Sequence, residues 1–272
     1  MNRRQFLQGA SALALTVHEG LAASFPKNVA RMAKPDEPRL LRLRLLTAAP
    51  LVRMKTFYHD LLGLPLIEEK AGEFSFAGGQ TAVTFAQAQP GHGEPFYHFA
   101  FNIPENKILG AHDWQKPRTP LDRLNANLRD PAMPNDIVHF RHWNAHSIFF
   151  WDPAGNLIEY IARHDLNNAA AGSFSARDIL YASEIAFISE QVTNTALEIR
   201  KTLGLDQYRD GDDRFRALGD ERGLLLIVIR GRRWGYEEKA PPTGIFPTVA
   251  EIRGAKPAHY SVAGHPYEIL VK

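Results

Sequence analysis

The sequence predicts an α+β protein made of repeated β-α-β-β-β units. The main evidence is one pattern that occurs twice, from Leu43 to Gly63 and from Glu184 to Gly204, with 20 positions between the first residue and the glycine in both copies. Each copy starts with a strand-like apolar run and continues with apolar residues at helical spacing, and the final glycine is typical of a helix end. Three short strand-like segments follow each helix, at residues 66–69, 73–76 and 81–87 in one copy and 207–209, 214–218 and 224–229 in the other.

A third copy with an insertion lies between these two, and a truncated fourth copy follows them. The third copy comprises a strand, a short helix, a proline-rich insertion, a second strand and a hairpin, at residues 97–103, 104–114, 115–134, 136–141 and 146–160. Near the C-terminus only residues 248–253 and 266–271 resemble strands. We therefore expect two tandem domains, residues 40–166 with two units and residues 180–272 with one complete and one truncated unit.

Composition narrows the class of protein. A length of 272 residues suits one large or two modest domains, and 44% hydrophobic with 23% charged residues is typical of a globular protein. The net charge of +2 argues against a nucleic-acid or anionic-membrane partner, and no apolar run has the length of a membrane-spanning helix. The chain contains no cysteine, which excludes disulfides, thiolate metal sites and a cysteine nucleophile.

The N-terminus resembles a twin-arginine export signal. Residues 2–9 read Asn-Arg-Arg-Gln-Phe-Leu-Gln-Gly, residues 10–17 form a mildly apolar core, and Leu-Ala-Ala at 21–23 or Ala-Ala-Ser at 22–24 offers a cleavage region. We expect a signal at residues 1–23, a linker at residues 24–39, and a periplasmic or otherwise extracytoplasmic location. A basic tail without a targeting role is the alternative.

The most informative local feature is the hairpin around Asp152-Pro153-Ala154-Gly155. Proline and glycine at these positions predict a type I turn followed by a left-handed residue. This geometry pairs Asp152 with Asn156, so Phe149 faces Glu159 across the ladder. Glu159 then stands in an otherwise apolar strand, where a carboxylate is costly unless a partner balances it. Arg163 is one such partner, and a bound cation is another.

Together these elements resemble the vicinal oxygen chelate superfamily, which includes glyoxalases, extradiol dioxygenases and bleomycin-resistance proteins. The resemblance covers residues 40–272. It depends on the helix end at residues 57–64 (Phe-Tyr-His-Asp-Leu-Leu-Gly-Leu), the hairpin at residues 152–159, and His98 between them. It implies paired units that curl into cupped mixed sheets, often with a divalent metal on the concave side. The layout is most similar to a bacterial branch with two tandem modules, which indicates a fold but no substrate.

The resemblance places metal ligands on the first and last strands of the units. His98 matches a first-strand ligand and Glu159 a last-strand ligand, a set that suits Fe(II), Mn(II), Zn(II) or Ni(II). The corresponding positions of the opening unit are Leu43 and Val83, which are not ligands. A third ligand then has to come from the nearby histidines, with His142 and His146 as candidates and His139 beside them. Strand alternation argues against His146, because Ser147 shares the face of Glu159.

The functional expectation is a cup, built from residues 40–163, that binds a small organic molecule with adjacent oxygens. His98 and Glu159 would be the catalytic residues of a lyase, isomerase or ring-cleaving dioxygenase step. Phe149 stands where extradiol dioxygenases carry a tyrosine, so that acid-base group is missing. The expected pocket residues are Asn102, Trp143, Ser147 and Phe149. A metal-free binding or sequestering protein, with Trp151 adding stacking surface, and a structural module with a vestigial cup are the alternatives, and His98 could also be an ordinary core histidine. Glu184, at the ligand position of the next unit, is interpreted as structural, and the second domain as a partner or dimerisation element of a homodimer.

Overall fold

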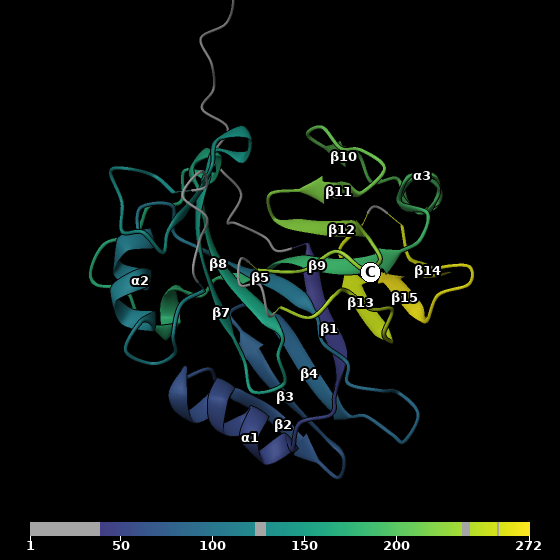
Figure 1. Ribbon diagram of the computed structural model, residues 1–272, viewed down its shortest axis with the longest axis horizontal. Helices are drawn as coiled ribbons and strands as arrows, with labels where there is room; N and C mark the ends of the chain where they lie inside the picture. Colours follow the sequence, from purple (N-terminus) through teal and green to yellow (C-terminus); the bar gives the residue numbers. More distant parts are fainter. Residues whose placement is uncertain (1–38, 123–128, 236–239, 255) are drawn as a thin grey trace, which may run out of the picture. The chain divides into compact units, whose positions relative to one another are not determined.

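The repeat units seen in the sequence appear as successive runs of strands and helices along the chain (Figure 1). The structure is a computed structural model that describes residues 39–122, 129–235, 240–254 and 256–272, all within one unit of residues 35–272. The expected signal at residues 1–23 and all but the last residue of the expected linker at 24–39 lie outside the described residues. No helix in the described ranges has both the length and the apolar character needed to cross a membrane.

The first and third units have the predicted β-α-β-β-β order. Both helical segments end next to a glycine with a left-handed backbone, Gly63 at φ +67° and Gly204 at φ +66°, as the sequence predicted. The first unit contains β1 (Leu40–Thr47), α1 (Leu51–Lys55), η1 (Thr56–Leu61), β2 (Leu66–Lys70), β3 (Glu73–Gly78) and β4 (Thr81–Gln87). The third contains β9 (Tyr181–Ser189), α3 (Val192–Leu203), β10 (Gln207–Tyr208), β11 (Phe215–Asp220) and β12 (Gly223–Ile229).

The second unit carries the insertion, and the described part of the fourth unit consists of strands. The second unit contains β5 (His98–Ile103), α2 (Ile108–Gln115), β6 (Val138–Phe140), η3 (Arg141–Trp143), β7 (Ala145–Trp151) and β8 (Leu157–Arg163), and two short turns follow, η4 (His164–Leu166) and η5 (Ala176–Asp178). The fourth contains β13 (Thr248–Ile252), β14 (Ala258–Ser261) and β15 (Tyr267–Val271).

The units pair in a different way from the expected domains. The first sheet has the order β14-β15-β13-β1-β4-β3-β2 and joins the first and fourth units. The second sheet has the order β10-β11-β12-β9-β5-β8-β7-β6 and joins the second and third units. The expected boundary between residues 166 and 180 therefore runs through the second sheet, and no cup forms from residues 40–163. The first three units share one strand pattern, so the pattern alone does not specify which two units pair.

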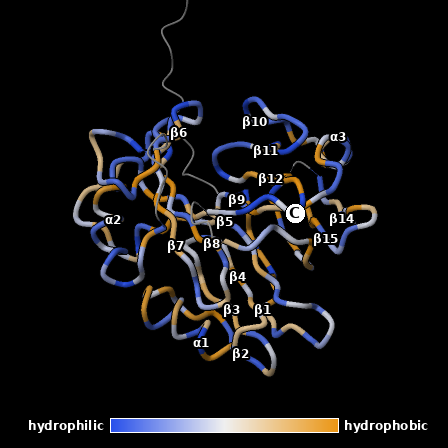
Figure 2. The backbone as a smooth tube through the Cα atoms, in the orientation of Figure 1, coloured by the Kyte–Doolittle hydropathy of each residue, from blue (hydrophilic) through white to orange (hydrophobic). Residues whose placement is uncertain are grey.

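One face of each sheet contributes to a shared hydrophobic core. Leu43, Val83 and Phe85 of the first sheet belong to the same buried cluster as Phe99 and Ile185 of the second. The rings of Phe85 and Phe99 lie 6.5 Å apart, which links the two sheets directly. β5, β7, β8 and β9 are buried along nearly their whole length, so these four strands of the second sheet are covered on both faces. Figure 2 shows its strand β12 as hydrophobic, whereas the edge strand β10 is hydrophilic.

The turn between β7 and β8 has the predicted geometry. Gly155 has φ +82°, and the Asp152 amide donates to the Asn156 carbonyl at 3.1 Å. Phe149 consequently pairs with Glu159, as expected. The buried Asp152 carboxylate also accepts the Tyr58 hydroxyl at 2.7 Å, which ties this turn to the first unit. The hairpin thus fixes the register that decides which face of β8 carries Glu159.

Candidate metal centre

Three polar side chains converge on one face of the second sheet because of its strand register. β5 lies between β8 and β9, and Ala100 of β5 pairs with Glu159 on one side and Glu184 on the other. Residues directly opposite one another on neighbouring strands point to the same face, and so do residues two apart on one strand. His98 therefore shares this face with both glutamates. Alanine between them leaves the space in which the three side chains meet.

The three side chains form a close, buried group. His98 Nε2 lies 3.4 Å from Glu159 Oε2 and 3.9 Å from Glu184 Oε2. One ligand atom from each residue lies within 4.8 Å of the others, and none of the three side chains is more than 4% exposed. These separations suit three atoms that surround a single ion at the usual bond lengths of about 2.0–2.2 Å.

The ring of His98 is held with one nitrogen facing the carboxylates. Its Nδ1 lies 3.0 Å from the carbonyl oxygen of Leu157, and a carbonyl only accepts, so the Nδ1–H donates. Nε2 is left facing Glu159 and Glu184, and in the neutral ring it offers a lone pair to a cation. A histidine that donates one N–H to a carbonyl and presents its other nitrogen is the usual arrangement at protein metal sites.

Arg163 is the ion-pair partner of Glu184. Its fully buried guanidinium pairs with Glu184 Oε1 and donates from Nε to Asn102 Oδ1 at 3.2 Å. Asn102 in turn donates to the Tyr181 hydroxyl at 3.1 Å and to the Glu221 carbonyl at 2.9 Å. The second oxygen of Glu184 remains directed at His98. The arginine that the sequence analysis offered as a partner for Glu159 is therefore the partner of Glu184.

The two carboxylates of the site are buried close to each other. Burial, and then the neighbouring Glu159, raise the pKa of Glu184 to about 7, although Arg163 and His98 oppose the shift. Glu159 Oε1 is buried and has no hydrogen-bond partner among the described residues. Because an unpaired buried carboxylate oxygen is costly, this atom is a specific reason to expect a cation at this position. The donor set of one imidazole and two carboxylates fits a divalent ion with open positions left for substrate.

The three residues line one end of a cavity of about 360 Å³. Aromatic and aliphatic side chains form most of its wall, contributed by Phe140, Trp143, Phe149, Leu157, Phe215, Leu226 and Trp234. Arg232 and Arg233 also line it and bring positive charge to a cavity that otherwise contains two carboxylates. A pocket that is mainly apolar, with a few convergent polar groups, is typical of small-molecule sites.

The structure brings some of the expected site residues together and separates others. His98, Glu159, Trp143 and Phe149 all line the cavity. Ser147 is buried on the same face of β7 as Phe149 but is not among the lining residues, and Asn102 acts through Arg163. His142 is exposed on η3, and His146 pairs with His139 on the opposite face of β7. Neither candidate third ligand reaches His98 and Glu159.

The sequence analysis did not place the segment at residues 232–234 in the site, and it gave Glu184 and Arg163 roles that differ from those in the structure. Glu184 was interpreted as structural because the partner strand of its unit seemed to be missing from the sequence pattern. Its position in an apolar strand, equivalent to His98 one unit later, was the signal available. Leu43 and Val83, which appeared to leave the site short of ligands, lie in the first sheet and face the core.

Comparison with known proteins identifies the fold. Neither a family model nor a curated protein matches the sequence. Among solved structures, a candidate dioxygenase from Bacillus subtilis matches with a TM-score of 0.55 and 15% identity, over 86% of this chain and 84% of that one. A variant of glyoxalase I from Zea mays matches with a TM-score of 0.52 and 13% identity, over 86% and 92%. The chain has the fold of the vicinal oxygen chelate superfamily, as the sequence predicted, with paired β-α-β-β-β units in curled mixed sheets.

Proposed function

We propose that the protein is a metal-dependent enzyme that acts on a small organic molecule with two adjacent oxygens. The observation that carries this proposal is the convergence of His98, Glu159 and Glu184 at one end of the cavity, with Glu159 Oε1 buried and unpaired. Three protein ligands with open positions are the usual composition of a catalytic site for zinc or non-haem iron. The reaction class is a lyase, isomerase or ring-cleaving dioxygenase step.

The ligands, the aromatic wall and the arginines of the cavity would each have a separate role in the reaction. A divalent ion held by His98, Glu159 and Glu184 would supply Lewis-acid polarisation of a substrate oxygen. The aromatic walls exclude water and pack against the apolar body of the substrate, while Arg232 and Arg233 favour a substrate that carries an anionic group. The two glutamates are the carboxylates among the lining residues, so a proton taken from substrate would pass to one of their oxygens.

Elemental analysis of protein purified without chelators tests the proposal. We expect Glu159→Gln and Glu184→Gln each to bind about one metal equivalent fewer than the wild type, because each loses a charged ligand. Glu251→Gln is a matched control, since this glutamate lies on β13 of the first sheet. Equal metal content in the wild type and both cavity variants would contradict the proposal.

Substrate binding can be tested with catechol and protocatechuate, a catechol that bears a carboxylate. Trp143 and Trp234 line the cavity, so bound ligand should alter tryptophan fluorescence. We expect protocatechuate to bind more tightly than catechol, and an Arg232→Gln/Arg233→Gln variant to lose this preference. Binding that is tight and unaffected by metal removal would instead favour the second candidate function, a metal-free binding or sequestering protein, for which the aromatic wall supplies stacking surface.

Two further proposals concern location and assembly. We propose export by the twin-arginine route, supported by residues 2–9. A mature N-terminus still at Met1 in the periplasmic fraction of the native host would contradict cleavage. A homodimer stays a prediction, to be tested by sedimentation analysis. Because the second and third units form a sheet within one chain, a second copy is not needed to bring the three ligands together.

A further inference from the structure

A second cluster of metal-ligating side chains lies at the edge of the second sheet. We call Asp130, His139 and His146 the edge cluster. His139 of β6 pairs directly with His146 of β7, so the two side chains stand side by side on one face, with ring centroids 4.2 Å apart and planes 13° apart. Alternation places His146 on the opposite face of β7 from Phe149, which lines the cavity. The edge cluster is therefore separate from the site at His98.

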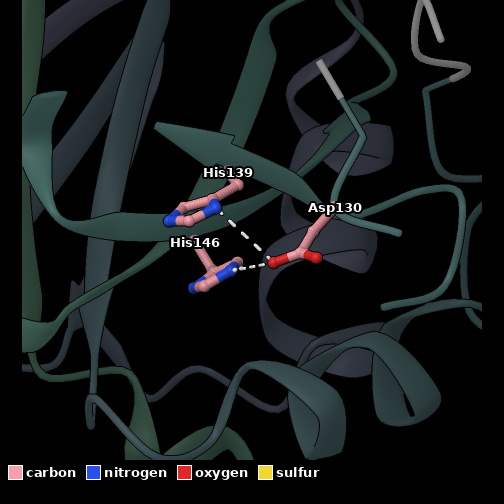
Figure 3. A group of neighbouring side chains, drawn as sticks. All are labelled: Asp130, His139 and His146. Carbon is pink, nitrogen blue, oxygen red and sulfur yellow. Dashed lines mark hydrogen bonds and ion pairs between the residues drawn. The ribbon is translucent and has the colours of Figure 1, made fainter. Parts of the chain in front are cut away.

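Both histidines of the edge cluster present a nitrogen to the same carboxylate oxygen (Figure 3). Asp130 Oδ2 lies 3.1 Å from His146 Nε2 and 3.5 Å from His139 Nδ1. The carboxylate is oriented by its other oxygen, which accepts the amide of Ala132 at 2.9 Å. His139 Nδ1 is buried and forms no hydrogen bond within the described residues, even though it faces Asp130. A buried, unpaired ring nitrogen aimed at a fixed carboxylate is an unfilled ligand position.

A chain of polar contacts behind His146 can hold its lone pair in place. His146 Nδ1 lies 2.7 Å from His164 Nε2, and His164 Nδ1 lies 4.0 Å from Glu105 Oε2. If His146 donates from Nδ1, then His164 carries its proton on Nδ1, next to Glu105, and His146 Nε2 is left as a lone-pair donor. A metal-bound histidine commonly donates its other N–H to such a relay, which raises its basicity.

We propose that the edge cluster binds a divalent transition ion such as Zn²⁺, held by Asp130 Oδ2, His139 Nδ1 and His146 Nε2. Two imidazoles and a carboxylate suit zinc, cobalt or nickel rather than magnesium or calcium. Asp130 belongs to the insertion between α2 and β6, whereas the two histidines belong to the sheet. The ion thus joins the insertion to the edge of the sheet and has a structural role, because it binds the folded arrangement and not the separated segments.

The same contacts also permit a metal-free arrangement, in which His146 donates a hydrogen bond from Nε2 to Asp130 and accepts one at Nδ1 from His164 Nε2–H. The two arrangements differ in what is measured. The metal site requires Asp130 and His139 for ion binding, whereas the hydrogen-bonded arrangement binds no ion and leaves His139 dispensable. Cobalt is a suitable probe because its visible absorption reports the ligand set.

The experiment titrates chelator-treated full-length protein with Co²⁺ and follows absorption and bound metal by equilibrium dialysis. We use the wild type, a cavity variant (His98→Ala/Glu159→Ala), an edge variant (His139→Ala) and a milder edge variant (Asp130→Asn). His142→Ala is the matched control, an exposed histidine on the turn between β6 and β7. We expect the cavity variant to retain about one equivalent, both edge variants to lose about one relative to wild type, and His142→Ala to match wild type.

Thermal unfolding supplies an independent readout that does not depend on activity. Co²⁺ or Zn²⁺ should raise the unfolding midpoint of the cavity variant but not of a cavity variant that also carries Asp130→Asn. A cavity variant that binds no Co²⁺, or edge variants with undiminished Co²⁺ binding, would overturn the proposal. A wild type that binds one equivalent, lost only in the edge variants, would support the edge cluster and contradict the proposed enzyme, so the two failures are distinguishable.

Discussion

Arg163 is the residue whose removal most directly tests the electrostatics of the cavity. It is fully buried, pairs with Glu184 Oε1 and donates to Asn102. Methionine has a similar length and no charge, so Arg163→Met removes the cation with little change in packing. Glu184 then loses its ion-pair partner, whereas the contacts of His98 with both glutamates remain. Breaking a buried ion pair from one side costs about 3–5 kcal/mol, because the remaining carboxyl group either stays charged in the interior or has to take up a proton there.

Urea unfolding in the presence of a chelator measures this cost. We expect Arg163→Met to lower the free energy of unfolding by about 3–5 kcal/mol, which corresponds to a fall in the thermal midpoint on the order of 10 °C for a domain of this size. The double variant Arg163→Met/Glu184→Leu should recover most of the loss, since it removes the uncompensated carboxylate as well. Added Zn²⁺ should also restore part of the stability of the single variant, because the ion supplies positive charge.

Two results would refute this reasoning. A loss below about 1 kcal/mol in the single variant would mean that the arginine is not the counter-charge of the site. A double variant as unstable as the single one would mean that the loss comes from packing or from Asn102, whose Oδ1 also loses a donor.

Three further predictions concern pH, a fourth ligand and the hairpin. Burial and Glu159 raise the pKa of Glu184 to about 7, so in chelator-treated protein the folded state binds more protons than the unfolded state. The free energy of unfolding should therefore fall as the pH rises from about 4.5 through about 7. Glu184→Gln should remove this part of the pH dependence, as measured by urea unfolding. Leu226 lines the cavity, and it pairs with Ala186 in the way that Glu159 pairs with Ala100. Leu226→His should therefore add a metal ligand and tighten Co²⁺ binding on the order of tenfold, measured in competition with a chelator. Weaker binding would show that residue 226 does not reach the ion. Tyr58→Phe removes the donor to buried Asp152 and should lower the free energy of unfolding by about 1–3 kcal/mol without changing the metal content. Tyr160→Phe is the control and should change stability little, because the Tyr160 hydroxyl has no hydrogen-bond partner among the described residues. Equal losses of stability in the two variants would show that the Asp152 contact does not matter.

Local sequence features predicted the elements of the fold well because each has a local physical cause. The glycine helix ends at Gly63 and Gly204 and the turn at Asp152 depend on residues a few positions apart. Repetition of the same local pattern then identified the units. The register of the hairpin followed from the turn, which is why the pairing of Phe149 with Glu159 could be predicted before the structure was known.

The third member of the cavity site could not be predicted in the same way, because it depends on a contact between two different units. Glu184 approaches His98 only because β9 pairs with β5. A strand pairing of this kind is decided by how the units pack as a whole, and a β-α-β-β-β pattern is equally compatible with pairing to the preceding unit. The sequence did contain the relevant residue, a carboxylate in an apolar strand, but it gave no reason to place that strand next to His98.

The first sheet shows why equal topology does not produce an equal site. Leu43 lies between Val83 and Ala250, as Ala100 lies between Glu159 and Glu184, yet this trio faces the shared core. On the outward face the central strand instead carries Arg42 and Arg44, whose side chains are largely exposed. These long cationic side chains occupy the outward face of β1, where no small residue like Ala100 leaves space for carboxylates to meet around an ion. The chemistry therefore depends on Ala100 and its two neighbours more than on the sheet itself, and acidic residues placed at Val83 would bury charge in the core instead of creating a second centre.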